Sequence, residues 1–422
     1  MSASIQRVRQ LSDQIAGPKK PSARDALLGA RSPADVVICL ALRTPLTKAY
    51  KGALKDTALD GLLVPLLNAV REKSTLDPQL VEEIVVGNVL HKDATFVTRA
   101  SCVAAGYPAS TAISTVSRWC SSGLLAVESV ANKIATGGID IGIAVGAESM
   151  STNPDNGAPE FSASFMANPV IKDITQSMGW TSENVAGDFN ISRELQDEFA
   201  AESFQKAEAS QKQGWPDDEI LPMTTVWKNP KTGELETVQV TRDDGVRYGT
   251  TKESLSKIRS AFPQWPPATT TGGNASQLTD GAAAVLLMRR DVAERLGQPI
   301  LARFVLSTVA GVDPRVMGIG PTVAIPKLLK KVGLSKDDID VFEINEAFAS
   351  MLVYCTQKLG LDKSRVNPRG GAIAFGHPLG CTGARQIVTA LSELKRTQQK
   401  FAVTSMCIGT GMGMASLIVS EV

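Results

Sequence analysis

Residues 112–145 read AISTVSRWCSSGLLAVESVANKIATGGIDIGIAV and contain one complete strand–helix–strand unit. The short run 112–116 precedes a helix that is predicted to begin at Ser121 and to end at the glycine pair 137–138. The apolar run 141–145 follows as a buried strand. Strands that alternate with helices indicate an α/β sheet covered by helices on both faces.

The same alternation continues on both sides of this unit. Predicted strands at 36–40 and 84–86 flank a predicted helix at 59–72. Residues 282–288 return to a buried strand, and a second α/β unit runs from about residue 300 to the end. The fold class predicted from this pattern is α/β throughout.

These elements predict three parts of the chain. Residues 1–33 are polar and irregular, and they are interpreted as a targeting or linker segment. Residues 34–298 form an N-terminal half, interrupted at about 151–265 by a loop-rich insertion that holds four of the five tryptophans. Residues 299–422 form a C-terminal half.

The two halves show signs of duplication. The segment LVEEIVVGN, which ends at Asn88, reads like DDIDVFEIN, which ends at Asn345. The motifs that begin at Cys120 and His377 are each expected near the start of a helix, and both pairs are 257 positions apart (345 − 88 and 377 − 120). A duplicated framework would place Cys120 and His377 at equivalent helix N-termini that face a shared centre.

The composition excludes several classes of protein. Lys and Arg number 44 and Asp and Glu 43, so the net charge of +1 provides no field to attract nucleic acid or an anionic membrane. No strictly apolar run exceeds seven residues, which is far short of a membrane span. The chain has only two histidines, His91 and His377, which argues against a multi-histidine metal site.

Cys120 and His377 are the first candidates for chemistry. Cys120 lies in SRWCSSG (117–123), where a strand gives way to a helix, and a helix N-terminus is predicted to lower the pKa of its thiol. His377 lies in the glycine-rich segment GGAIAFGHPLGCTG (370–383), with Pro378 predicted in the first turn of a helix. Interpretations without a catalytic role also remain open: Cys120 as a small buried hydrophobic residue and His377 as a structural histidine. His91 is interpreted as a residue of a polar loop.

Two further strand ends carry polar or reactive groups. Cys407 and Gly409 lie in CIGTGMG (407–413), which follows a predicted strand, and its glycine N–H groups could hold an oxyanion. No acidic residue about 20 positions further on completes a dinucleotide site, because the chain ends first. Asn345 begins NEAFA at the end of another predicted strand, where polar residues tend to line a ligand crevice.

The order CSSG, NEAFA, GHPLG and CIGTG resembles the four signature blocks of the thiolases, and the resemblance covers roughly residues 36–422. It implies a five-layer αβαβα fold of two similar halves, a loop excursion that covers coenzyme A, and a homodimer. The implied reaction is the thiolytic step of fatty-acid β-oxidation, in which CoA cleaves a 3-ketoacyl-CoA to acetyl-CoA and a shortened acyl-CoA by a ping-pong mechanism.

The resemblance also implies a role for each reactive residue. Cys120 would become acylated, and His377 would act as the general base for Cys120 and later for CoA. Cys407 would protonate the acetyl-CoA enolate. Asn345, through a water, and His377 would stabilise a thioester oxygen, and the N–H groups of Cys120 and Gly409 would stabilise the other oxyanion.

Contacts with CoA are implied for a second group of residues. These are Ser276, Met178, Ala347 and Phe348. CoA enters as a substrate, and no metal or redox cofactor is expected.

The chain departs from the thiolase pattern at three places, and three alternatives are weighed. Ser117 replaces the usual Asn, HKDATF at 91–96 replaces a small-residue stretch, and Gly272 replaces the usual Ala. Cys407 argues against a decarboxylating condensing enzyme. Gln176, where a biosynthetic acetoacetyl-CoA thiolase usually has His, argues against that branch. The intact reactive residues argue against a non-enzymatic acyl-CoA carrier.

The N-terminus resembles a type 2 peroxisomal targeting signal. Such a signal has a basic–aliphatic pair, here Arg7-Val8, then five residues, then Gln and an aliphatic residue, here Gln14-Ile15. A helix through this segment would present Val8, Leu11 and Ile15 on one side for an import receptor. Peroxisomal location is therefore expected.

Overall fold

The computed structural model describes residues 22–422. The residues assigned to the targeting signal, Arg7, Val8, Leu11, Gln14 and Ile15, lie outside the described part. The described chain begins with the helix α2 (Ala23–Gly29), which is anchored to the C-terminal half by a hydrogen bond of 2.8 Å from Arg24 to Asp340. Within residues 22–422, no helix is both long enough and apolar enough to cross a membrane.

The first half of the fold is one side of a mixed β-sheet. Its strands, in spatial order, are β4 (Ala112–Val116), β3 (Glu83–Gly87), β5 (Ile141–Ser149), β8 (Thr279–Arg289) and β1 (Val36–Arg43), with the short β2 (Thr47–Lys48) beside β8. The pairs β3/β4 and β3/β5 are parallel, as the strand–helix–strand pattern predicts, whereas β8 runs antiparallel to both neighbours.

The second half repeats this arrangement with fewer strands. Its spatial order is β9 (Ala302–Gly311), β12 (Met412–Ser420), β11 (Phe401–Ile408) and β10 (Val341–Ile344). A short antiparallel pairing, Val37 with Arg303 and Ile38 with Ala302, joins β1 to β9 and makes the two halves continuous. Asn88 and Asn345 follow directly after β3 and β10, so the two similar motifs occupy corresponding strand ends.

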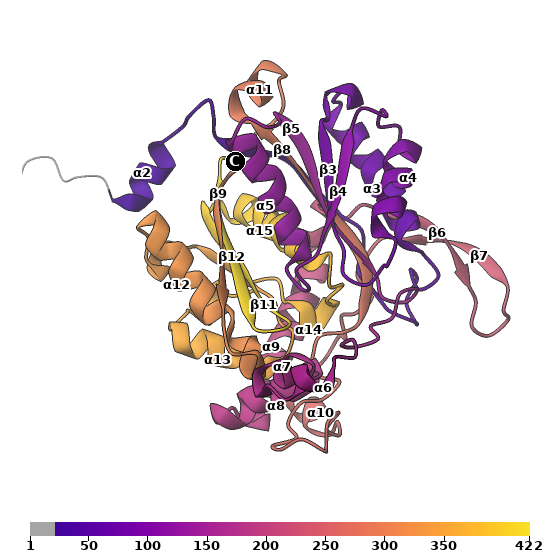
Figure 1. Cartoon of the computed structure of the whole chain (residues 1–422), viewed down its shortest axis with the longest axis vertical. Helices are drawn as coiled ribbons and strands as arrows, with labels where there is room; N and C mark the ends of the chain where they lie inside the picture. Colours follow the sequence, from indigo (N-terminus) through magenta and orange to yellow (C-terminus); the bar gives the residue numbers. More distant parts are fainter. Residues whose placement is uncertain (1–21) are drawn as a thin grey trace, which may run out of the picture.

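Helices and strands alternate in five layers, with helices on the two outer sides and in the middle (Figure 1). The outer helices are α3 (Leu59–Ser74) and α4 (Ala94–Ala104) on the first half, and α12 (Pro321–Val332) and α13 (Ala349–Leu359) on the second. The helices α5 (Ser122–Ala135) and α15 (Thr382–Thr397) lie between the two halves, where both contact strands and each other. The predicted α/β class and the five-layer αβαβα arrangement are confirmed.

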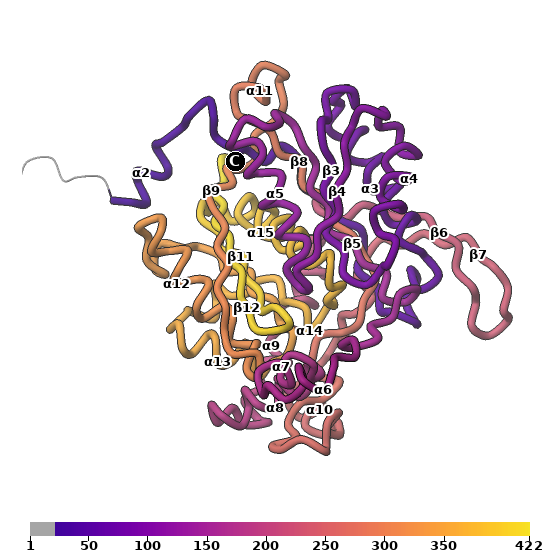
Figure 2. Tube along the Cα trace, viewed as in Figure 1, coloured from indigo at the N-terminus to yellow at the C-terminus, as the bar shows by residue number. Residues whose placement is uncertain are grey.

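The loop-rich insertion gathers mainly at one end of the molecule, below the strands in Figure 2. Its elements are α6 (Ala163–Met166), α7 (Pro169–Ile174), α8 (Met178–Asp188), α9 (Arg193–Lys212), α10 (Lys252–Ser256) and the hairpin β6 (Met223–Lys228) with β7 (Leu235–Val240). The hairpin projects sideways from the body. The small helices α11 (Arg290–Arg295) and α14 (Ala372–Phe375) belong to the two halves.

The two central helices meet at glycines near their N-termini. A Cβ atom on Gly123 would lie 2.6 Å from the carbonyl oxygen of Gly380, and one on Gly383 would lie 2.2 Å from the backbone nitrogen of Leu124. Real Cβ atoms do not approach other atoms this closely, so both positions need glycine. This contact brings the segments that carry Cys120 and His377 together.

One local prediction is wrong. Pro378 does not lie in the first turn of a helix, because α15 begins only at Thr382. The intervening residues form a turn in which the N–H groups of Cys381 and Thr382 donate to the carbonyl of Pro378 at 3.0 and 3.1 Å. The turn accommodates the close approach of Gly380 to the first half.

We predict that Gly123→Ala destabilises the protein by about 1–3 kcal/mol, because the added methyl group has no room between α5 and the Gly380 turn. Alanine otherwise favours a helix over glycine, so a loss of stability would report the steric contact. The measurement is thermal or denaturant unfolding. Gly272→Ala is the matched control, since nothing lies within 4 Å of its Cβ position. Equal stability of the two variants would contradict the assigned contact.

Candidate active site

Cys120 lies in a tight turn between β4 and α5. The N–H of Ser121 donates to the carbonyl of Arg118 at 3.0 Å, and Ser122 closes the turn through its hydroxyl, which donates to the carbonyl of Trp119 at 2.7 Å. Trp119 has a positive φ of 43°. The turn places Cys120 directly before the N-cap of α5, with only 8% of the residue exposed.

The structure overturns the predicted low pKa of Cys120. Burial raises the pKa of the thiol to about 11. The N–H groups of Gly409 and of Cys120 itself hydrogen-bond the sulfur and lower the pKa, but less than burial raises it. At neutral pH the resting nucleophile is therefore a thiol, and a base must remove its proton. The two N–H groups that converge there are the pair expected to hold an oxyanion.

His377 is buried and its ring is held at both nitrogens. The Thr382 hydroxyl donates to the carbonyl of Pro378 at 3.0 Å, so at 2.5 Å from Nδ1 it must accept a proton from the ring. Nε2 is then the unprotonated nitrogen, and the Nδ2 amide of Asn345 lies 3.3 Å from it. Burial, and secondly the charge of Arg385, lowers the pKa of His377 to about 3. The ring is a neutral base with its lone pair on Nε2.

Asn345 and Cys407 come from neighbouring strand ends. The N–H of Asn345 donates to the carbonyl of Ser405 at 2.9 Å, across the parallel pair β10/β11. The Oδ1 atom of Asn345 is buried and has no hydrogen-bond partner among residues 22–422, so it is free to accept from a water or a substrate. Burial, and then the proximity of Cys120, raises the pKa of Cys407 well above its ordinary value.

The five predicted catalytic residues thus form one connected group. Cys120 accepts from the N–H of Gly409, two positions beyond Cys407, and Cys120 lies close enough to Cys407 to raise the pKa of its thiol. Asn345 bonds the strand of Cys407 and faces His377. Two neutral thiols, one neutral imidazole and a pair of N–H donors therefore share one buried site.

The residues expected to bind CoA lie beside this group. Met178, at the start of α8, has its sulfur 3.8 Å from the position of a Cβ on Gly409. Ala347 and Phe348 pack with Met178 and Cys407 in one apolar cluster. Ser276 joins them through its N–H, which donates to the carbonyl of Ala347 at 3.0 Å.

Comparison with known proteins matches the sequence that forms this site to one family. Residues 36–291 match the family profile "Thiolase, N-terminal domain" and residues 298–420 match "Thiolase, C-terminal domain". The chain belongs to the thiolase family.

Individual thiolases are similar over nearly the whole chain. A peroxisomal 3-ketoacyl-CoA thiolase of Yarrowia lipolytica is 51% identical over 419 residues, 99% of this chain and 100% of that protein. The crystal structure of the dimeric peroxisomal thiolase of Saccharomyces cerevisiae superimposes with a TM-score of 0.86 at 48% identity, covering 93% of this chain and 99% of that one. Human mitochondrial 3-ketoacyl-CoA thiolase in complex with CoA has a TM-score of 0.81 at 34% identity, with 92% and 98% coverage.

Two residues of the thiolase site were not singled out from the sequence. Thr382 sets the tautomer of His377, and it lies only five positions further along GHPLGCT, so the motif itself holds the signal. Glu148 is fully buried in the strand β5, and its carboxylate accepts the N–H of Gly380 at 3.0 Å. An acidic residue inside the otherwise apolar strand IGIAVGAES was the signal for it.

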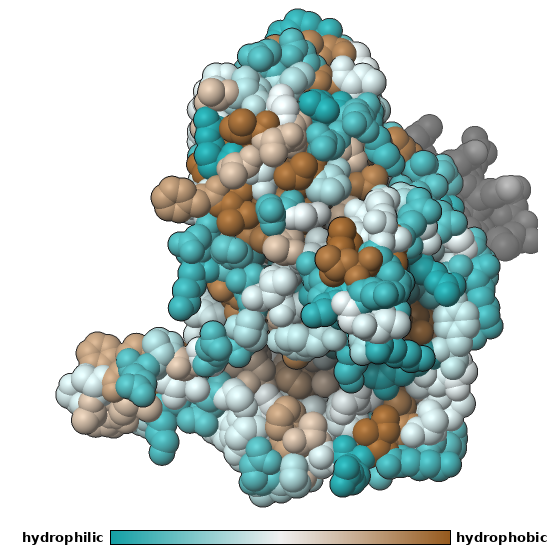
Figure 3. Space-filling view, turned by 90° about the vertical axis from the view of Figure 1, so that its right-hand side faces the viewer, coloured by the Kyte–Doolittle hydropathy of each residue, from teal (hydrophilic) through white to brown (hydrophobic). Residues whose placement is uncertain are grey.

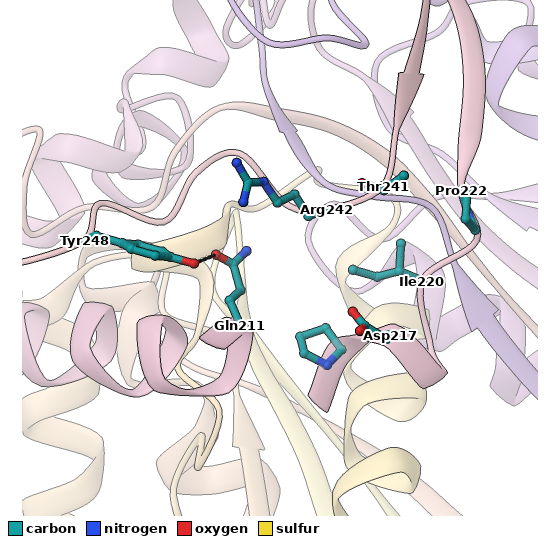
Figure 4. Close-up of a pocket in the computed structure, with 8 residues that line it drawn as sticks. Gln211, Asp217, Ile220, Pro222, Thr241, Arg242 and Tyr248 are labelled. Carbon is teal, nitrogen blue, oxygen red and sulfur yellow. Dashed lines mark hydrogen bonds between the residues drawn. The ribbon is translucent and has the colours of Figure 1, made fainter. Parts of the chain in front are cut away.

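A separate surface pocket contains none of these residues (Figure 4). Its volume is about 340 Å³, and it lies between the end of α9 and the segment that follows β7. The side chains of Gln211 and Tyr248 face each other across it with a hydrogen bond of 3.1 Å. Its lining residues are Gln211, Pro216, Asp217, Ile220, Pro222, Thr241, Arg242 and Tyr248.

We predict that iodoacetamide labels Cys120 first, because the other five cysteines are at most 1% exposed. Since the reactive form is the thiolate, the labelling rate should rise about tenfold per pH unit above neutrality, without a plateau below about pH 9. Peptide mass spectrometry of samples quenched over time measures both. A plateau close to pH 7 would indicate a thiolate stabilised by the helix, and first labelling of another cysteine would reject Cys120 as the nucleophile.

Proposed function

We propose that this chain cleaves 3-ketoacyl-CoA with CoA, yielding acetyl-CoA and an acyl-CoA shortened by two carbons, as a thiolase of fatty-acid β-oxidation. The observation that carries the proposal is that Cys120 and Cys407 share one buried site with the neutral ring of His377. The ring is tied to this site through Asn345, which contacts His377 and bonds to the strand that carries Cys407. One thiol serves as the nucleophile and the second as an acid, and the imidazole moves protons between them. The close similarity to 3-ketoacyl-CoA thiolases supports this substrate class.

In the first half-reaction, Nε2 of His377 takes the proton of Cys120, and the sulfur attacks the 3-keto carbon. The bond between C2 and C3 then breaks, leaving the acyl group on Cys120 as a thioester and an enolate of acetyl-CoA. Cys407 donates its proton to C2 of that enolate. The raised pKa of Cys407 keeps its thiol protonated until an enolate is formed.

In the second half-reaction, the proton that His377 took from Cys120 passes to the thiolate of Cys407. His377 then accepts the proton of an incoming CoA thiol, whose sulfur attacks the acyl thioester. Cys120 leaves and recovers its proton from His377, so all groups regain their resting states. The N–H groups of Cys120 and Gly409 stabilise the oxygen of each tetrahedral intermediate. Asn345, through a water, and His377 stabilise the thioester oxygen, which becomes the oxygen of the acetyl-CoA enolate.

CoA is a substrate in this scheme, and the proposed steps use no metal or redox cofactor. Ser276, Met178, Ala347 and Phe348 are the proposed contacts of the CoA arm. Their support is their position beside Cys407 and Gly409.

A homodimer is proposed through the edge strand β4. Among residues 22–422, this strand ends the sheet order and pairs only with β3. Exposed apolar side chains lie near it in the sequence, with Phe96 at 82%, Val103 at 52% and Trp119 at 45% exposure. The face on the side of α3 and α4 carries several apolar patches in its upper part (Figure 3). The S. cerevisiae relative is a dimer, and a second copy of this chain would cover such patches.

Peroxisomal import is proposed through the N-terminal signal. Thiolases that are about half identical to this chain are named as peroxisomal. The spacing of Arg7, Val8, Gln14 and Ile15 supports recognition by an import receptor.

We predict that Cys407→Ala lowers thiolysis by about 10²- to 10⁴-fold, because the enolate loses its proton donor. Acylation of Cys120 by a saturated acyl-CoA needs no proton transfer at carbon and should persist. Thiolysis is assayed on 3-ketoacyl-CoAs of several chain lengths, and exchange of the acetyl-CoA methyl protons with D₂O is followed by NMR. Exchange should be lost in this variant. Wild-type exchange would make Cys407 structural, and a wild-type protein without thiolysis would refute the proposed function.

We also predict that residues 1–25 direct a fused fluorescent protein into peroxisomes. The basic and amide side chains of the signal are expected to hold the receptor, so replacing Arg7 and Gln14 by Ala should leave the fusion in the cytosol. Microscopy with a peroxisomal marker reads out both. A wild-type fusion that remained cytosolic would refute the assigned signal.

A further inference from the structure

The two halves of the fold carry different reactive groups at one corresponding strand position. In the first half, Gly146 of β5 pairs with the last residue of β3, and Glu148 lies two positions further on. In the second half, Ser405 of β11 pairs with the last residue of β10, and Cys407 lies two positions further on. Glu148 is therefore the counterpart of the proposed acid, and the proposed mechanism does not use it.

The carboxylate of Glu148 is fully buried and is held by four hydrogen-bond donors. Oε1 accepts from the side-chain amide of Asn88 at 2.9 Å and from the N–H of Leu90 at 3.2 Å. Oε2 accepts from the N–H of Val89 and the N–H of Gly380, both at 3.0 Å. Three of these donors belong to the turn after β3, and the fourth belongs to the turn that carries His377.

No cation balances this carboxylate within residues 22–422, where it forms no ion pair with Lys or Arg. Some other buried carboxylates are paired, as Glu343 is with Arg385 at 2.9 Å and Asp243 with Arg43 at 2.7 Å. Glu183, Glu346 and Asp280 are, like Glu148, held by neutral hydrogen-bond donors. A buried carboxylate that is held only by hydrogen-bond donors is most strongly stabilised when all the donors are in place. The ionised form of Glu148 therefore depends on the geometry of the two turns.

We propose that ionised Glu148 is a positioning residue for the thiolase reaction, because it clamps the Gly380 turn and thereby fixes His377 relative to Cys120. This inference rests on the proposed function. Gly380 follows His377 by three residues, and a Cβ on it would lie 2.6 Å from the carbonyl oxygen of Ala147, next to Glu148 in the chain. The turn therefore sits directly on the end of β5.

Protonation of Glu148 would loosen this clamp. Its pKa is raised to about 7 by burial, against the lowering effect of its hydrogen bonds. Below that pH one carboxyl oxygen carries a proton and can no longer accept from both of the donors that point at it, so at least one donor loses its partner. The base His377, whose pKa is about 3, stays neutral over the same range. We therefore expect kcat to fall as the pH drops below about 7, with Glu148 as the titrating group.

The titration of Glu148 must be distinguished from that of other ionisable groups near it. The thiols of Cys120 and Cys381 interact with it, but burial raises their pKa values to about 11 and about 12, so both remain neutral. Asp280 lies on the adjacent strand β8, and burial raises its pKa to about 6. His91 belongs to the same turn, where its backbone N–H donates to Oδ1 of Asn88 at 3.0 Å.

The test compares Glu148→Gln with the wild-type enzyme in a thiolysis assay over the range from about pH 5.5 to 9. Glutamine keeps the size but turns an NH₂ group toward backbone donors, so kcat should fall by about a hundredfold through misplacement of His377. The KM for CoA should change little, since the CoA contacts lie elsewhere. The fall of kcat below about pH 7, the acid limb of the pH profile, should disappear. Asp280→Asn and His91→Gln are matched controls that should keep that limb.

A second variant addresses the case in which Glu148→Gln does not fold. Asn88→Ala removes one donor and leaves the carboxylate, so the pKa of Glu148 should rise and the acid limb should move to higher pH. Activity of Glu148→Gln within about twofold of wild type, an unchanged acid limb in it, or an unmoved limb in Asn88→Ala would overturn the proposal. Each of these outcomes is distinct from failure of the proposed function, which would leave the wild-type protein inactive.

Discussion

The site depends on one steric constraint, the contact between the N-terminal ends of α5 and α15. At that point Gly123 and Gly380 leave no room for a side chain, so the two halves of the fold approach backbone to backbone. Cys120 precedes the first helix and His377 precedes the second, and the contact sets their separation. The parallel strand ends then place Asn345 and Cys407 at the same edge, because β10 and β11 are paired. A duplicated framework alone would not bring these groups together without the small residues at its centre.

Removal from water decides the protonation states within this contact. Burial raises the pKa of both Cys120 and Cys407 and lowers that of His377, so the resting site holds neutral groups. Burying uncompensated ions would cost more than burying neutral partners. Charge instead arises during the reaction, at an oxygen where N–H groups already point and at a carbon beside a protonated thiol. Hydrogen bonds that strengthen only when charge develops favour the transition state over the ground state.

Much of this arrangement could be predicted from the sequence, because the signals that predict it lie in short stretches of neighbouring residues. The alternation of apolar runs predicted the α/β class, and the motifs around Cys120, Asn345, His377 and Cys407 identified the residues that the fold brings together. The pKa of Cys120 was wrongly predicted, because a helix N-terminus is visible in the sequence whereas complete burial by distant segments is not. The start of α15 was also misplaced, since a close tertiary approach by Gly380 replaces the expected first turn. Glu148 escaped notice because its partners lie 58 to 232 positions away.

Glu148 and Cys407 have different roles in the two halves because different numbers of hydrogen-bond donors point at their side chains. Glu148 and Cys407 occupy corresponding positions, yet four donors saturate the carboxylate. Among residues 22–422, only the backbone N–H of its own residue is directed at the buried thiol of Cys407. A saturated carboxylate is a poor proton carrier, because each proton it accepts must displace a hydrogen bond. A thiol with few partners can lose and regain a proton without rearranging its neighbours. The same strand position therefore suits a clamp in one half and proton transfer in the other, and the donors supplied by the adjoining turns determine which of the two it becomes.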